Sequence, residues 1–203
     1  MATATARLNH SSLLLCFLIN TTISNSPITI KLEFKLKILY LNVSPSPDLS
    51  RNKLVEVPNE CTNYYSLERL LLYHNIIKSI PDNISALQSL VYLDISRNQL
   101  SYLPSSVCLL QHLQCLVAHN NRLVSLPEEI GEMNKLMELD VSCNEIAHLP
   151  VQIGDLANLR SLHLRRNHLQ EVRFRSIRQN LTLDSNLESS SINCSSQPRS
   201  LWS

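Results

Sequence analysis

Glycine is nearly absent from this chain, whose 203 residues include only Gly131 and Gly154. Nucleotide-binding loops wrap phosphates with glycine-rich backbone, so the sequence argues against nucleotide chemistry. No charge of one sign dominates either: lysine and arginine total 18, aspartate and glutamate total 17, and the formal net charge is +1. The sequence therefore provides no overall attraction to nucleic acid or to an anionic membrane, and any partner must be recognised locally.

Paired cysteines are also missing. The six cysteines form no C-x-x-C pair and no tight cluster, so neither a zinc site nor a disulfide framework is predicted. We interpret them as reduced, structural thiols, because a free cysteine packs as a small apolar residue. We therefore expect no cofactor and no metal.

A long hydrophobic run is missing too, and no transmembrane segment is predicted. The apolar run 13–19 is too short to span a bilayer and barely reaches the length of a signal-peptide core. We expect a cytoplasmic protein, with secretion as the alternative if residues 1–26 act as a signal peptide. The alternating segment 28–43 predicts a strand that covers the first repeat.

Asparagine recurs every 23 residues without insertion or deletion. The positions are Asn52, Asn75, Asn98, Asn121, Asn144 and Asn167. Apolar residues stand two and five residues after each asparagine, and proline follows the second of these in five units. The unit reads LxxLxLxxNxLxxLPxxIxxLxx, and such a period is typical of a repeat architecture.

Each unit predicts one coil of a leucine-rich-repeat solenoid. This is an α/β fold with a curved parallel sheet on the concave face and short helices or 3-10 turns on the convex face. Proline suits the start of a turn, because it fixes φ and donates no hydrogen bond. The asparagine side chain carries donors and an acceptor, so a stacked column can satisfy backbone groups that stacking buries. We therefore predict that the repeating asparagines form a structural ladder.

Four segments carry a more specific resemblance: 90–104 (LVYLDISRNQLSYLP), 120–131 (NNRLVSLPEEIG), 136–146 (LMELDVSCNEI) and 165–169 (RRNHL). They resemble the amino-terminal repeats of the animal family that joins leucine-rich repeats to a calponin-homology domain. The resemblance implies a cytoplasmic scaffold near the cortical actin cytoskeleton. It also implies protein partners among the DOCK-type exchange factors that activate Rho-family GTPases, or among other small-GTPase regulators.

The repeat register stops at both ends. Ser44 and Pro47 replace the leucines expected upstream of Asn52, and Arg173 replaces the proline expected downstream of the last unit. We predict a non-repeat amino-terminal segment at 1–47, a solenoid at 48–175, and a disordered tail rich in serine, asparagine and glutamine at 176–203. Because no calponin-homology domain follows the repeats, we expect a truncated form of the family that it resembles.

Side chains alternate across a strand, so the residues between the buried leucines face the concave surface. They fall in four columns, at six, four, two and one residues before each asparagine. Tyrosine and arginine offer large contact area with a directional polar group, so we place protein binding on this face. The candidate contact residues are Arg69, Tyr73, His74, Tyr92, Asp94, Arg97, His119, Glu138, Asp140, His163 and Arg165.

The acidic, serine and histidine residues on this face are not spaced as a catalytic site requires. Asp94 and Asp140 lie two coils apart, roughly 10 Å by strand spacing. His119 stands between two serines of its column, but an open sheet predicts no oxyanion hole. The column histidines fall in different repeats, unlike the closely spaced ligands of a metal site. We predict that the chain is not an enzyme and has no catalytic residue.

The sequence therefore predicts a non-catalytic intracellular module that binds protein, either as a scaffold or as a competitor for the same ligand. Nucleic acid is not an expected partner, because the basic stretch 160–178 has almost no interleaved aromatic residues. Two alternatives stay open: a secreted or cell-surface leucine-rich-repeat recognition protein, and a leucine-rich-repeat scaffold of the Ras pathway.

Overall fold

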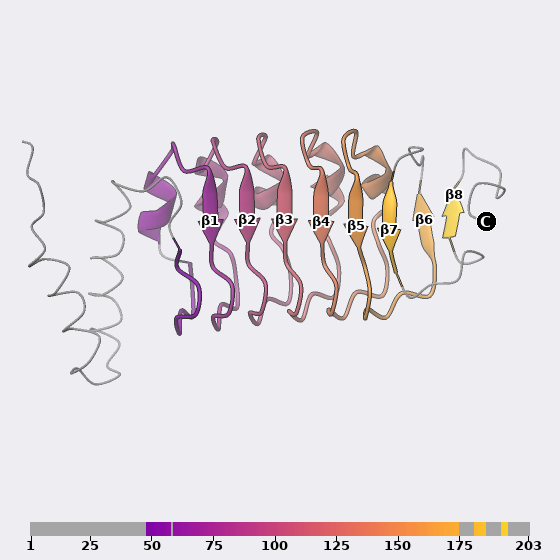
Figure 1. Ribbon diagram of the computed structural model, residues 1–203, viewed down its shortest axis with the longest axis horizontal. Coiled ribbons are helices and arrows are strands. Elements are labelled where there is room, and N and C mark those ends of the chain that lie inside the picture. The colour runs from indigo at the N-terminus through magenta and orange to yellow at the C-terminus, as the bar shows by residue number, and fades with distance from the viewer. Residues whose placement is uncertain (1–47, 58, 175–180, 186–191, 195–203) are drawn as a thin grey trace, which may run out of the picture. The chain divides into compact units, whose positions relative to one another are not determined.

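The computed structural model describes residues 48–57, 59–174, 181–185 and 192–194 (Figure 1). The strands are β1 (Arg69–Leu71), β2 (Tyr92–Asp94), β3 (Cys115–Val117), β4 (Glu138–Asp140), β5 (Ser161–His163), β6 (Val172–Phe174), β7 (Thr182–Asp184) and β8 (Ile192–Cys194). The 3-10 helices are η1 (Asn59–Asn63), η2 (Asp82–Ala86), η3 (Ser105–Leu109), η4 (Glu128–Glu132) and η5 (Val151–Asp155). The segment predicted at 1–47, with its apolar run and its strand at 28–43, lies outside the described residues.

Six of the strands form one parallel sheet, in the order β1-β2-β3-β4-β5-β7. Arg69 pairs with Tyr92 and Tyr92 with Cys115, so each step from β1 to β5 advances the sequence by one 23-residue unit. Figure 1 shows these strands side by side in one layer, with the 3-10 helices in a second layer. The predicted leucine-rich-repeat solenoid is confirmed, and its second layer consists of 3-10 turns only in the part that the structure describes.

The core lies between the two layers. The middle residue of each strand from β1 to β5 is a leucine that is fully buried, and the apolar residues two and five positions after Asn52, Asn75, Asn98 and Asn121 are buried as well. Stacking makes this core continuous, because each leucine packs against its equivalents in the neighbouring coils. Burial of apolar surface stabilises a fold by about 25 cal/mol per Å², so each buried leucine of the stack contributes to stability.

Proline starts the turns η2 to η5. Its φ lies between −75° at Pro81 and −63° at Pro150, within the range that the pyrrolidine ring allows. The proline carbonyl accepts the first turn hydrogen bond, as from the N–H of Ile84 to Pro81 O at 3.0 Å. That bond turns Ile84 and its equivalents inward, where they are buried.

The repeating asparagines bridge successive coils. Nδ2 of Asn98 donates to the carbonyls of Leu72 and Ile95, each at 3.0 Å, and its Oδ1 accepts from the Ile77 N–H at 3.0 Å. The same three bonds recur at Asn75, Asn121, Asn144 and Asn167. Asn52, in the first described coil, donates to the carbonyls of Leu49 and Ser50. Each later asparagine therefore ties its own turn to the coil before it.

A row of residues with positive φ runs beside this ladder. One residue before each asparagine, φ lies between 52° and 57°, in the left-handed region. These rim residues are Arg51, His74, Arg97, Asn120, Cys143 and Arg166. From Arg51 to Cys143, the N–H of each rim residue donates to a carbonyl of the next coil at 2.8–3.0 Å. The stacking of coils therefore holds non-glycine residues in a conformation that costs about 1–2 kcal/mol in a free chain.

The conformation of the rim is testable at Asn120, whose side chain is exposed in the middle of the array. Asn120→Val is expected to lower the free energy of unfolding by about 1 kcal/mol, because a β-branched side chain disfavours positive φ. Asn120→Gly, the matched control, is expected to change it by no more than a few tenths, because glycine adopts positive φ freely. Urea unfolding followed by circular dichroism measures both, and equal stability of the two variants contradicts the argument.

The sheet continues into the predicted tail. β7 pairs with β5, with His163 opposite Asp184, and β6 pairs with β8. The strands β7 and β8 lie inside the tail predicted from 176 onward, and the rest of that tail outside 181–185 and 192–194 lies beyond the described residues. From Leu162 to its partner Leu183 the step is 21 residues rather than 23, so counting by the fixed period lost the register there.

Candidate functional site

The candidate contact residues lie on the exposed sheet face, which is the face predicted to be concave. Within each strand from β1 to β5, the buried leucine is flanked on both sides by residues that reach solvent. The candidates that are exposed are Arg69, His74, Arg97, Glu138 and Arg165. The candidates that are half-buried are Tyr73, Tyr92, Asp94, His119, Asp140 and His163. The structure thus brings side chains from distant units into adjacent positions on one surface.

Arg69 and Tyr92 form a cation-π pair across β1 and β2. The guanidinium carbon of Arg69 lies 4.2 Å from the centroid of the Tyr92 ring. Partial burial raises the pKa of Tyr92, the nearby Asp94 carboxylate raises it further, and Arg69 opposes the shift. The phenol is therefore neutral at physiological pH and keeps a hydrogen to donate.

An Asp-x-Ser turn closes β2 and recurs two coils later at the end of β4. Asp94 Oδ1 accepts from the Ser96 N–H at 3.0 Å and from the Ser96 hydroxyl at 2.6 Å. Asp140 and Ser142 repeat these distances. At the second turn, His119 Nδ1 also lies 3.5 Å from Asp140 Oδ2. Both carboxylates are therefore held in place by local hydrogen bonds.

Asp184 of β7 is a site residue that sequence reasoning missed. Its carboxylate forms an ion pair with Arg165 Nε and lies 3.6 Å from His163 Nδ1. A signal was present, because a Leu-Asp pair ends β2, β4 and β7 alike. The two-residue shortening of the last step hid it from a count by 23.

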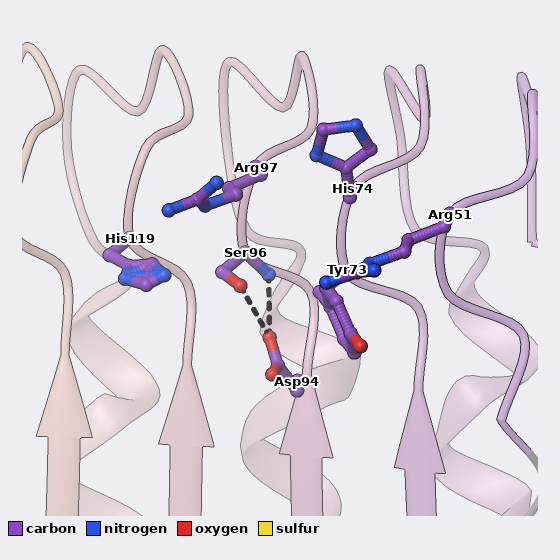
Figure 2. Close-up of a pocket in the computed structure, with 7 residues that line it drawn as sticks. All are labelled: Arg51, Tyr73, His74, Asp94, Ser96, Arg97 and His119. Carbon is purple, nitrogen blue, oxygen red and sulfur yellow. Dashed lines mark hydrogen bonds between the residues drawn. The ribbon is translucent and has the colours of Figure 1, made fainter.

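A pocket opens at the β1 end of the exposed sheet face (Figure 2). Its lining residues come from four successive coils and are Arg51, Tyr73, His74, Asp94, Ser96, Arg97 and His119. Figure 2 shows Asp94 bonded to Ser96 low in the pocket, with Arg51 and Arg97 on separate coils. Most of the lining residues were candidates from the sequence. Arg51 was missed because the coil of Asn52 lacks the strand leucines that define the columns.

On the sheet face that the structure describes, serine and histidine form no catalytic pair. The hydroxyls of Ser96 and Ser142 donate to their own aspartates rather than to the histidine between them. Asp94 and Asp140 flank Val117 on separate strands. Within the described part of the chain, no three His, Cys, Asp or Glu side chains gather as a metal site requires. A surface of this kind can bind through charge, aromatic area and hydrogen bonds.

Cys108, Cys115 and Cys143 are free thiols. Burial raises the pKa of Cys108 to about 12, and burial together with Glu138 raises that of Cys115 to about 12. Because the thiolate is the reactive form, these two cysteines are unreactive near neutral pH. Cys108 is fully buried and packs within its coil, whereas Cys115 is half-buried on the exposed sheet face.

The fold and the site define a leucine-rich-repeat solenoid with an open, polar sheet face. The family model for a leucine-rich repeat region matches residues 35–200, and the chain belongs to the leucine-rich-repeat family. This family and fold are typical of non-catalytic modules that bind other proteins. Among the described residues, no helix is long and apolar enough to cross a membrane.

The more specific resemblance is confirmed over a short stretch. The chain is 56% identical over 45 residues to the leucine-rich repeat and calponin homology domain-containing protein of Drosophila melanogaster. It is 60% identical over 46 residues to leucine-rich repeat and calponin homology domain-containing protein 1 of Homo sapiens. These matches cover 22% and 23% of this chain but only 6% of each relative.

Solved structures share the fold. The leucine-rich-repeat domain of the type III effector XopL aligns with a TM-score of 0.65 at 21% identity, covering 91% of this chain and 64% of that domain. A leucine-rich-repeat protein of Leptospira interrogans aligns with a TM-score of 0.54 at 26% identity, covering 79% of this chain and 47% of that one. The plant peptide hormone receptor RGFR1, solved in complex with RGF2, aligns with a TM-score of 0.55 at 26% identity, covering 68% of this chain and 23% of the receptor.

Proposed function

We propose that this chain is a non-catalytic interaction module that binds a segment of another protein on its exposed sheet face. The observation that carries the proposal is the row of accessible tyrosine, histidine, arginine and carboxylate side chains that successive coils align on one rigid surface. Such a surface is already ordered before binding, so little conformational entropy is lost when a partner docks. Tyrosine and arginine anchors supply most of the affinity in interfaces of this kind.

The partner class follows from the resemblance to the calponin-homology-linked family. We propose a regulator of small GTPases, with DOCK-type exchange factors of the Rho family as the first candidates, and action in the cytoplasm near the cortical cytoskeleton. The support is the 56–60% identity of the matched repeats to members of that family.

A second candidate is a secreted recognition module. Its support is the similarity to a plant peptide hormone receptor, together with Asn83, which starts an N-x-S sequon and is exposed on η2. Mass spectrometry of the chain expressed in animal cells separates the two candidates. Cleavage near residue 26 and glycan on Asn83 support secretion, whereas an intact, unglycosylated chain in the cell lysate supports the cytoplasmic module.

Affinity capture from animal-cell cytosol tests the binding face. The intact chain is compared with a variant in which Tyr73, Arg97, His119 and Glu138 are changed to alanine. A matched control carries alanine at four exposed positions away from the sheet face, namely Gln111, Glu132, Asn134 and Lys135. We expect an exchange factor to be recovered by the intact chain and the control, and at least about tenfold less by the sheet-face variant. Equal recovery by all three forms contradicts the proposed binding face.

A further inference from the structure

The pocket at the β1 end of the sheet contains two arginines that no carboxylate neutralises within the described residues. Within the described residues, the basic side chains that lie close to a carboxylate oxygen are His119, His163, Arg165 and Arg173, and neither Arg51 nor Arg97 is among them. Arg165 shows the contrast, because Asp184 of the neighbouring strand pairs with its guanidinium. Arg51 and Arg97 are both exposed, so their charge is available to a partner.

The backbone conformation of the rim fixes the positions of the Cα atoms of these two arginines. Both have φ in the left-handed region, and their N–H groups donate to Tyr73 O at 2.9 Å and to His119 O at 2.8 Å. They stand two coils apart, so their Cα atoms are roughly 10 Å apart by strand spacing. Both side chains are long enough to reach an oxyanion between them. Figure 2 shows His74 on the coil between them, at the same edge of the pocket.

Tyr73 and Asp94 complete the pocket below the arginines. Arg51 lies over the Tyr73 ring, with 5.9 Å from the guanidinium carbon to the ring centroid, so its stem has an aromatic support. Asp94 is held through Oδ1 by Ser96, and its second oxygen, Oδ2, has no hydrogen bond within the described residues. Oδ2 can therefore accept an N–H from the backbone of a bound segment.

The charges of the lining select the class of anion. Arg51 and Arg97 contribute two positive charges and Asp94 one negative charge, so these three residues together carry one net positive charge. A monoanion balances that charge. A dianionic phosphate would leave excess negative charge beside Asp94, whose carboxylate repels it. Charge complementarity thus favours a carboxylate.

We propose that this pocket binds the side-chain carboxylate of an aspartate or glutamate in an extended segment of the partner. The carboxylate lies between the guanidinium groups of Arg51 and Arg97, and Asp94 accepts a backbone N–H of the same segment. This assignment rests on the proposed function, because it names the chemistry of the partner at one end of the proposed binding face. It identifies the pocket as the position that discriminates acidic segments from neutral ones.

Peptides with a defined central residue test the assignment on the full chain. The probes are immobilised, carboxy-terminally amidated peptides whose central residue is glutamate, glutamine, phosphoserine or lysine, with randomised flanks. Amidation removes the terminal carboxylate, so the central side chain is the variable anion. We expect the labelled chain to be retained about tenfold more by glutamate-centred than by glutamine-centred peptides, as for an accessible charge-assisted pair.

Variants at the two arginines link that preference to the pocket. Arg51→Gln with Arg97→Gln is expected to abolish the preference for glutamate, and Arg51→Lys with Arg97→Lys to keep part of it, because lysine retains the charge without the planar fork. The matched control is Arg122→Gln with Arg166→Gln. It changes one other rim residue and one other exposed arginine, both outside the pocket. Coincident urea unfolding curves confirm that all forms are folded.

The remaining outcomes separate this inference from the proposed function. If all four kinds of peptide retain the chain equally and the four-alanine sheet-face variant is not retained, the pocket assignment is wrong and the proposed binding face is supported. A stronger preference for phosphoserine than for glutamate overturns the choice of a carboxylate. Retention by no peptide at all contradicts both the pocket assignment and the binding of a linear protein segment.

Discussion

Replacing Asn121 with alanine is expected to lower the free energy of unfolding by about 3 kcal/mol, because the change removes hydrogen bonds in the buried centre of the ladder. The side chain of Asn121 is only 9% exposed. Its Oδ1 accepts from the Leu100 N–H at 3.1 Å, and its Nδ2 donates to the carbonyls of Ile95 and Ala118 at 3.0 and 3.1 Å. Alanine replaces none of these bonds.

The three backbone groups that form hydrogen bonds with Asn121 are not affected equally by the substitution. The Ile95 carbonyl also accepts from Asn98, and the Ala118 carbonyl also accepts from Asn144, so each keeps one ladder bond. The Leu100 N–H has no second acceptor in the ladder. Water does not reach this N–H, because Leu100 is fully buried. An unsatisfied buried N–H costs about 1–3 kcal/mol, and the remaining loss comes from the two weakened carbonyls and the small cavity.

Chemical denaturation followed by circular dichroism measures the effect, with two comparison variants. Asn134→Ala removes an exposed asparagine and is expected to change the free energy of unfolding by less than about 0.5 kcal/mol. Asn167→Ala removes a half-buried rung near the last described coils, and it is expected to cost less than Asn121→Ala because water reaches that turn. If Asn121→Ala costs no more than Asn134→Ala, the ladder does not stabilise the stack.

The sequence predicted the repeating part of the structure because one physical unit repeats without change. Asparagine marks the turn, leucine marks the strand and proline marks the start of the 3-10 helix. The spacing of these residues was therefore enough to predict the sheet register from β1 to β5. The columns of side chains on the sheet face follow from the same count. Each of these features depends on local chemistry that recurs in every coil.

The features that were missed depend on contacts between coils rather than on a repeating letter. Positive φ at the rim is shared by arginine, histidine, asparagine and cysteine, and no residue type marks it. Arg51 joins the pocket from a coil whose strand leucines are absent, and Asp184 joins the sheet after a step of 21 residues. A search with a fixed period of 23 residues finds only residues at that exact spacing. Hydrogen bonds to the neighbouring coil can form even where the connection between two strands is shorter.

The positions of the two glycines have a structural reason on the turn side of the solenoid. Ten residues after each of the first five repeating asparagines, the chain carries a small residue, and both of its glycines stand in that column. The column is Thr62, Ser85, Cys108, Gly131 and Gly154. Gly131 lies in η4, which packs against η5 of the next coil. A β-carbon built on Gly131 would lie 2.6 Å from the backbone oxygen of Gln152 and 3.0 Å from its Cβ.

Gly131→Ala is therefore expected to lower the free energy of unfolding by about 2 kcal/mol, because η4 and η5 must move apart. Alanine also restricts the unfolded chain, and that effect opposes the loss by only about 0.5–1 kcal/mol. Glu129→Ala, at an exposed position of the same 3-10 helix, is the matched control and is expected to be nearly neutral. Adding Gln152→Gly removes the contact with Cβ but keeps the backbone oxygen, so it is not expected to restore stability. Recovery of full stability in that double variant, measured by urea unfolding, would show that a side chain rather than the neighbouring backbone excludes the methyl group.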